Sequence, residues 1–158
     1  MPQYAAYSPE AAVAVIAAEA DQEGALMPIL HALNDTFGYV PDEAVPVIAG
    51  VLNLSRADVH GVLTFYHDFR RHPPARNIVK LCQAEACQAR GGVALTAHAE
   101  QRLGMKIDPH GHDRKDVSLE PIYCLGLCSH GPNALVNGRP HARLTPERFD
   151  ALMAETVR

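Results

Sequence analysis

Apolar residues recur at helical spacing along the first half of the chain. The clearest stripe repeats every three or four positions over about residues 24–37, which predicts an amphipathic helix. Its members are Leu26, Leu30, Leu33 and Phe37. Three more helices are expected: one begins after Ser8, one opens near Pro41, and one is capped by Ser55. Because these helices are short, closely connected and one-sided, they should pack as a small bundle.

The second half alternates between strand-like and helix-like segments in the order β-α-β-β-β-α. Strands are expected over 77–82, 117–123, 133–137 and 140–144. Helices are expected over 89–104, with the flexible pair Gly91-Gly92 before it or at its start, and after Thr145. Asn137-Gly138 is a hairpin signal between the last two strands. This order predicts an α/β domain with a mixed four-stranded sheet. Prolines and arginines over 70–76 mark a boundary, so we predict a helical bundle over 1–74 and the α/β domain over 75–158.

Composition narrows the class of protein. Of 158 residues, 47% are apolar and 20% charged, as in globular proteins, and the formal charge of −4 comes without a basic block. A nucleic-acid partner is therefore not expected, and residues 45–63, which also fit a helix-turn-helix, are interpreted as bundle core. No apolar run approaches the roughly 20 residues of a membrane span, so direct membrane insertion is not expected. The N-terminal segment lacks a secretory pattern, which predicts a cytoplasmic protein.

The four cysteines stand in two loops, Cys82-x4-Cys87 and Cys124-x3-Cys128. In a reducing compartment such cysteines favour metal or redox chemistry over disulfides. Each loop follows a predicted strand. A right-handed β-α-β unit makes the two strands parallel, so both loops should leave the sheet at one edge. A four-sulfur site means zinc or iron–sulfur. We predict a 2Fe–2S cluster in which Cys82 and Cys87 hold one iron, and Cys124 and Cys128 the other.

Zinc is the alternative that the spacing leaves open. Structural zinc sites usually take ligands from tight Cys-x2-Cys pairs, whereas these loops are wider and suit a larger cluster. Gly126 and Gly131 also allow backbone N–H groups to approach an anionic cluster closely. A zinc-stabilised binding module therefore stays the more distant alternative, and a free-standing ferredoxin shuttle is disfavoured by the large helical half.

Several motifs in this order carry a family resemblance. They are residues 25–30, 37–41 and 59–66, the Cys-x4-Cys loop, and Cys124-Leu-Gly-Leu-Cys128 with Pro132. Together they resemble the thioredoxin-like 2Fe–2S subunit of NADH:quinone oxidoreductase (complex I), NAD-reducing hydrogenases and NAD-dependent formate dehydrogenases. The resemblance covers nearly the whole chain. It implies a thioredoxin-like fold for the second domain and one-electron transfer, with Cys82, Cys87, Cys124 and Cys128 as cluster ligands.

The resemblance also implies partners. An adjoining flavoprotein subunit would bind FMN and NAD, and the chain itself has no Gly-rich phosphate motif and no catalytic residues of its own. The short chain and its Cys-Gln-Ala-Glu-Ala-Cys loop look most like the gamma subunit of an NAD-dependent formate dehydrogenase, which adds a larger molybdenum or tungsten catalytic subunit. The equivalent subunit of complex I or of a hydrogenase is the alternative. His130 would either tune the cluster or stand in an exposed loop.

Overall fold

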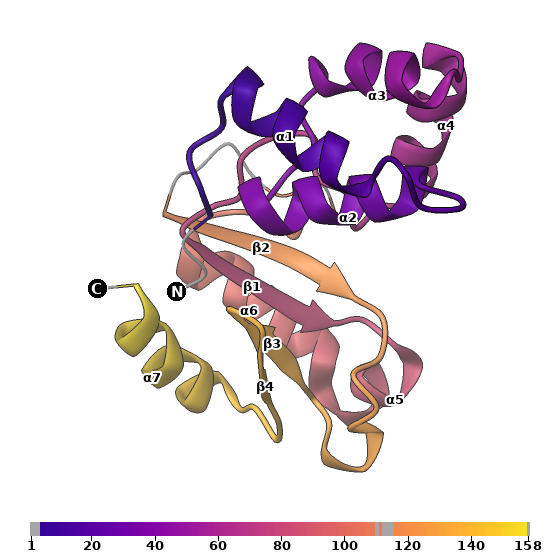
Figure 1. Cartoon of the computed structure of the whole chain (residues 1–158). Coiled ribbons are helices and arrows are strands. Elements are labelled where there is room, and N and C mark those ends of the chain that lie inside the picture. The colour runs from indigo at the N-terminus through magenta and orange to yellow at the C-terminus, as the bar shows by residue number, and fades with distance from the viewer. Residues whose placement is uncertain (1–3, 110, 112–115, 158) are drawn as a thin grey trace. The chain divides into compact units, whose positions relative to one another are not determined.

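The computed structural model describes residues 4–109, 111 and 116–157 of the chain. The chain divides into two compact units, one ending at Pro73 and the other beginning at Pro74. Among the described residues, the regular elements of the first unit are all helices, and the second unit contains the sheet, as Figure 1 shows. This arrangement confirms the predicted order of a helical bundle followed by an α/β domain.

The first unit consists of four helices. They are α1 (Pro9–Glu19), α2 (Leu26–Phe37), α3 (Ala44–Leu52) and α4 (Arg56–Phe65). The apolar stripe of α2 is buried at Leu30, Leu33 and Phe37, and α1, α3 and α4 add Ile16, Ile48 and Leu63 to the same core. The hydrophobic spacing of residues 24–37 therefore predicted which face of α2 packs inward.

Side-chain caps explain where two of these helices begin. The Ser8 hydroxyl accepts a hydrogen bond from the Ala11 N–H at 3.1 Å. Ser55 and Asp58 form a reciprocal capping box, with the Asp58 N–H donating to the Ser55 hydroxyl and the Ser55 N–H donating to the Asp58 carboxylate. At the other end, α2 stops at Gly38, whose φ of 81° is left-handed and suits glycine.

The second unit is built on a four-stranded sheet with the order β2-β1-β3-β4. The strands are β1 (Asn77–Cys82), β2 (Val117–Ile122), β3 (Ala134–Val136) and β4 (Arg139–His141). β1 pairs with β2 in parallel, whereas β1–β3 and β3–β4 are antiparallel, so the sheet is mixed as predicted. Asn137 and Gly138 both have positive φ in the β3–β4 turn, which is the backbone that a tight hairpin requires.

Two helices, α6 (Val93–Leu103) and α7 (Pro146–Thr156), share one core with the sheet. Leu95 of α6 and Phe149 of α7 join Val79, Leu81 and Leu119 there. Because residues alternate between the two faces of a strand, these core positions place both helices on the same face of the sheet. None of the helices in the described ranges is both long enough and apolar enough to cross a membrane.

The helix expected over 89–104 begins later than that span. α6 starts at Val93, and the preceding residues form a short turn, α5 (Glu85–Cys87), and a kinked segment, η1 (Gln88–Gly92). Gly91 breaks the helix because its φ of 96° is left-handed. Residues 89–92, which were expected to belong to the helix, instead form part of the connection between Cys87 and α6.

Candidate metal centre

The sheet brings the two cysteine loops to one edge. Cys82 is the last residue of β1 and lies in register with Ile122, the last residue of β2, two positions before Cys124. Since the two strands are parallel, the loops leave the sheet in the same direction. Cys87 closes the α5 turn, and Cys128 opens a single 3-10 turn, η2 (Cys128–His130). The strand prediction thus placed both loops correctly.

The four thiols form two pairs that differ in exposure. The Cys124 and Cys128 Sγ atoms are 3.4 Å apart and exposed, whereas Cys82 and Cys87 are buried and their thiols hydrogen-bond each other. Electrostatic interactions of Cys128 with Cys82 and with Cys87 link the two pairs. Within the described ranges, no three His, Cys, Asp or Glu side chains are grouped to hold one metal ion. The thiols are arranged pairwise instead, and a two-iron cluster with four cysteines takes two thiolates on each iron.

Backbone N–H groups point at the sulfurs. Burial raises the pKa of the Cys82 thiol. Backbone N–H donors from Ala84, Cys124 and Leu125, together with the hydrogen bond from the Cys87 thiol, outweigh burial and hold that pKa below its usual value. The Gly126 N–H lies 3.4 Å from the Cys124 sulfur, and the φ of 74° at Gly126 forms this turn. Such donors favour the thiolate, which is the form that binds metal.

The ionisation of Cys87 and of Cys128 is opposed by the neighbouring thiols. Burial is the largest cause that raises the pKa of Cys87, and the neighbouring Cys82 thiol adds to it. The pKa of Cys128 is raised first by its hydrogen bond with the Cys124 thiol. Thiols that oppose one another's ionisation are stabilised as thiolates by a cationic metal centre. The donor set therefore fits a metal cluster.

The comparisons with known proteins agree with this geometry. Residues 12–157 match the family described as thioredoxin-like [2Fe-2S] ferredoxin. The chain belongs to this family. The thioredoxin-like ferredoxin is 35% identical over 133 residues to a component of the NADH-quinone oxidoreductase of Escherichia coli K12, covering 84% of this chain and 80% of the relative. It is 30% identical over 137 residues to the corresponding component in Pseudomonas aeruginosa, covering 87% of this chain and 82% of the relative.

The fold also occurs in crystal structures of an NAD+-reducing [NiFe]-hydrogenase. The H2-reduced structure superposes with a TM-score of 0.68 at 23% identity over 83% of this chain, and the air-oxidised structure with 0.66 at 26% identity. This chain spans only about a fifth of the matched hydrogenase chain, 22% of its length. The resemblance inferred from the motifs is thus confirmed for the family.

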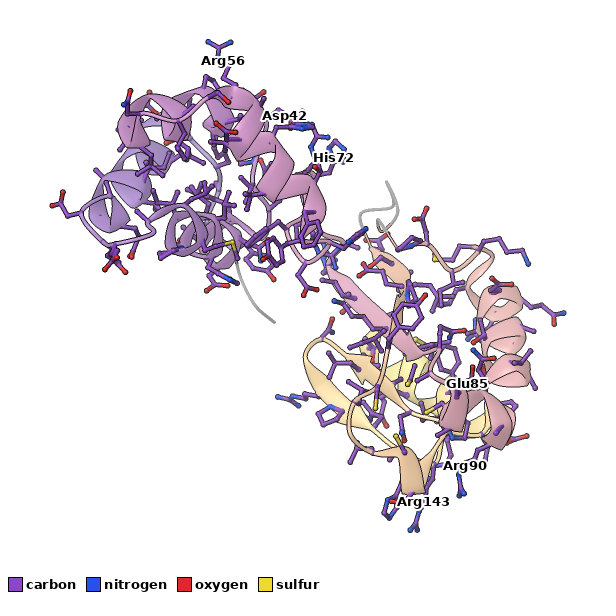
Figure 2. All side chains as sticks on the ribbon, turned by 90° about the vertical axis from the view of Figure 1, so that its right-hand side faces the viewer. Asp42, Arg56, His72, Glu85, Arg90 and Arg143 are labelled. Atoms are coloured by element: carbon purple, nitrogen blue, oxygen red, sulfur yellow. The ribbon has the colours of Figure 1, made fainter. Side chains whose placement is uncertain are left out.

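Two glycines of the thioredoxin-like ferredoxin make room for the Cys87 turn. A Cβ on Gly92 would lie 2.6 Å from the Cys87 carbonyl oxygen, and a Cβ on Gly131 would lie 3.3 Å from the Cys87 sulfur. Arg90 links the segment after Cys87 to Gly131, since its Nε donates to the Gly131 carbonyl at 3.2 Å. In Figure 2, Arg90 and Arg143 lie at the same end of the unit as Glu85 of this turn.

Sequence reasoning missed Asn133 and left His130 open. The Asn133 amide donates to the Leu127 carbonyl at 2.8 Å and lies 3.5 Å from the Cys87 sulfur. Its only signal in the sequence was its position after Pro132, close to the second cysteine loop. The His130 Nδ1 lies 2.8 Å from the Ser129 hydroxyl and shares a hydrogen bond with it. That contact does not join His130 to a cysteine sulfur.

Proposed function

We propose that this ferredoxin is an electron-transfer subunit that holds one 2Fe–2S cluster beside a flavoprotein subunit. The observation that carries the proposal is the meeting of Cys82, Cys87, Cys124 and Cys128 as two thiol pairs at one edge of the sheet. When bound, a 2Fe–2S cluster supplies one-electron transfer.

The four cysteines would bind the two irons of that cluster as a buried pair and an exposed pair. Cys82 and Cys87 would bind one iron on the buried side, where the sheet and the α5 turn exclude water. Cys124 and Cys128 would bind the other iron from an exposed loop. An electron donor or acceptor could therefore approach on the exposed side. The N–H groups at Ala84, Leu125 and Gly126 stabilise the negative charge on the sulfurs.

The nature of the partner follows from redox chemistry. NAD exchanges two electrons as a hydride, and a flavin can pass these on one at a time. We expect FMN and NAD to lie on a partner flavoprotein subunit. The relatives named as components of NADH-quinone oxidoreductase support this assignment. The chain would then be part of an NAD-dependent oxidoreductase, with no substrate site of its own and a cytoplasmic location.

The parent complex that we propose is a soluble NAD-dependent formate dehydrogenase with a larger molybdenum or tungsten subunit. The Cys82–Cys87 loop sequence supports it. The equivalent subunit of complex I or of an NAD-reducing hydrogenase is the second candidate, supported by the relatives and by the shared fold. Purification of the tagged chain with its partners, followed by assays with formate, hydrogen and a quinone, decides between them. NAD-linked oxidation of formate in the purified complex is the expected result.

The cluster itself is tested on the chain purified without oxygen. We expect a red-brown protein with about two irons and two acid-labile sulfides per chain, as a [2Fe–2S] site requires. A colourless chain with one zinc would overturn the electron-transfer proposal and favour a binding module. Replacing Cys124→Ser should remove or strongly alter the visible spectrum. An unchanged spectrum would remove Cys124 from the ligand set.

A further inference from the structure

Asn133 contacts Cys82, Cys87 and the residue before Cys128, although it lies outside both cysteine loops. It directly precedes β3 and is only 2% exposed. Its backbone carbonyl accepts the Cys82 N–H at 3.0 Å, and its backbone N–H hydrogen-bonds the Cys87 thiol. Two hydrogen bonds of its own backbone, to Cys82 and to Cys87, therefore fix the position of Asn133.

The Asn133 side chain makes a third connection. Its Nδ2 donates to the Leu127 carbonyl at 2.8 Å, one residue before Cys128, and lies 3.5 Å from the Cys87 sulfur. Its Oδ1 is buried and has no hydrogen-bond partner among the described residues. The opposite amide orientation would place Oδ1 against a carbonyl oxygen and a sulfur, which are both acceptors. The surroundings of the amide therefore select the orientation that donates.

An unpartnered buried amide oxygen costs stability, and an apolar side chain of similar size would avoid that cost. What the asparagine supplies in return is two N–H donors, one for each cysteine loop. Donors that face a cluster sulfur stabilise its more reduced and more negative state, and thereby raise the reduction potential. The contacts of Asn133 therefore affect both the distance between the two cysteine loops and the negative charge on the Cys87 sulfur.

We propose that Asn133 is a positioning residue of the cluster, which fixes the Cys87 turn against the Cys128 loop and raises the reduction potential through its N–H donor to the Cys87 sulfur. This inference rests on the proposed function, since it needs the cluster to be bound. It adds a residue that touches a ligand and is not itself a ligand.

The test compares Asn133→Leu with a matched control in the full-length, cluster-loaded chain. Asn77→Leu is the control because Asn77 is 3% exposed and also makes two side-chain hydrogen bonds, with Asp116 and Asn137. Asn77 lies at the opposite end of β1 from Cys82. Midpoint potentials come from anaerobic spectroelectrochemistry, with the EPR spectrum of the reduced protein as a second readout.

We expect the potential of Asn133→Leu to become more negative, by a shift equivalent to about a tenfold change in the reduction equilibrium, or about 59 mV for one electron. The EPR spectrum should change as well, while Asn77→Leu keeps the wild-type potential. If Asn133→Leu takes up no cluster, Asn133→Ala, which removes the N–H donors and adds neither bulk nor charge, is measured instead. A more negative potential in that variant, or failure of both Asn133 variants to hold a cluster that Asn77→Leu retains, supports the proposal.

Three results would overturn the inference. One is a wild-type potential and spectrum in a fully loaded Asn133→Leu protein. Another is an equal shift in Asn133→Leu and Asn77→Leu, which would reduce Asn133 to a structural role. The third is a wild-type potential in Asn133→Ala. A wild-type chain that binds no iron would instead overturn the proposed function, so the two failures are distinguishable.

Discussion

At the scale of single residues, Gly92 is the position where the Cys87 turn has the least room. A Cβ there would lie 2.6 Å from the Cys87 carbonyl oxygen and 2.9 Å from the carbonyl carbon, both of which are backbone atoms. A side-chain rotation cannot relieve such a contact. Any larger residue must therefore displace the backbone that carries Cys87.

We predict that Gly92→Ala destabilises the protein by about 1–3 kcal/mol, the usual cost of overpacking. It should also lower the iron content of the purified chain. Gly61→Ala is the matched control, since Gly61 lies inside α4 and its Cβ would meet nothing within 4 Å. Urea unfolding and iron assays on both variants measure the two effects. Equal stability and iron content in the two variants would disprove the steric role of Gly92.

The cysteines and Asn133 show what a sequence can predict about single residues. The sequence predicted that Cys82 and Cys124 lie close together, because a β-α-β connection makes its two strands parallel. This motif has one dominant handedness, so its outcome can be predicted from a local pattern. The contact of Asn133 with Cys87 joins residues 46 positions apart. It depends on how the α5 turn packs against the segment before β3, and no periodic pattern encodes that packing. Cys124 likewise adopts a left-handed φ of 75°, which cysteine rarely does.

At the scale of elements, the C-terminal end of α6 is held by an ionised side chain. Glu100 accepts hydrogen bonds from the Lys106 ammonium at 2.6 Å and from the Ile107 N–H at 3.1 Å. The Lys106 contact, followed by the Ile107 N–H, lowers the pKa of Glu100 below its usual value. Since the folded-state pKa is the lower one, the charged Glu100 stabilises the fold above its ordinary pKa and loses this effect as the pH falls through the folded value.

We therefore predict that Glu100→Gln lowers the free energy of unfolding at pH 7 by at most about 1 kcal/mol, because Lys106 is largely exposed. The difference from the wild type should shrink as the pH falls below 4.5, the ordinary value for this carboxyl. Urea unfolding at pH 7, 5 and 3.5 measures it. Lys106→Gln serves as the control and should follow the same pH dependence. A difference that is as large at pH 3.5 as at pH 7 would show that the charge on Glu100 is not its cause.

The start of α6 marks the limit of prediction for elements. The apolar spacing located the helix and its end at Gly104, whose φ of 64° makes it the expected left-handed stop. A start at residue 89 was too early, because the residues before Gly91 are compatible with a helix, whereas the alternative start at Gly91-Gly92 lies next to Val93, where α6 begins. In the fold these residues form a turn instead, because Cys87 packs against Gly131. This tertiary packing outweighs their local preference for a helix.

At the scale of the whole molecule, the described residues form two hydrophobic cores with no residue in common. One consists of residues from α1 to Phe69, and the other of residues from the sheet, α6 and α7. All four cysteines belong to the unit that begins at Pro74. A unit with its own core can fold alone, and its length lies above that at which small domains usually need added cross-links.

We predict that a fragment over residues 74–158 folds cooperatively and binds about two irons and two sulfides, because it carries both the sheet and every proposed ligand. Its far-UV circular dichroism should show a mixed α/β protein, with one thermal transition. The visible spectrum should match that of the full chain, since the sulfurs receive their described N–H donors from within this unit. A fragment carrying Cys82→Ser is the control for adventitious iron. If the unmodified fragment is unfolded, or folds yet holds no cluster that the full chain holds, the cluster depends on the helical unit and the two cores do not act independently.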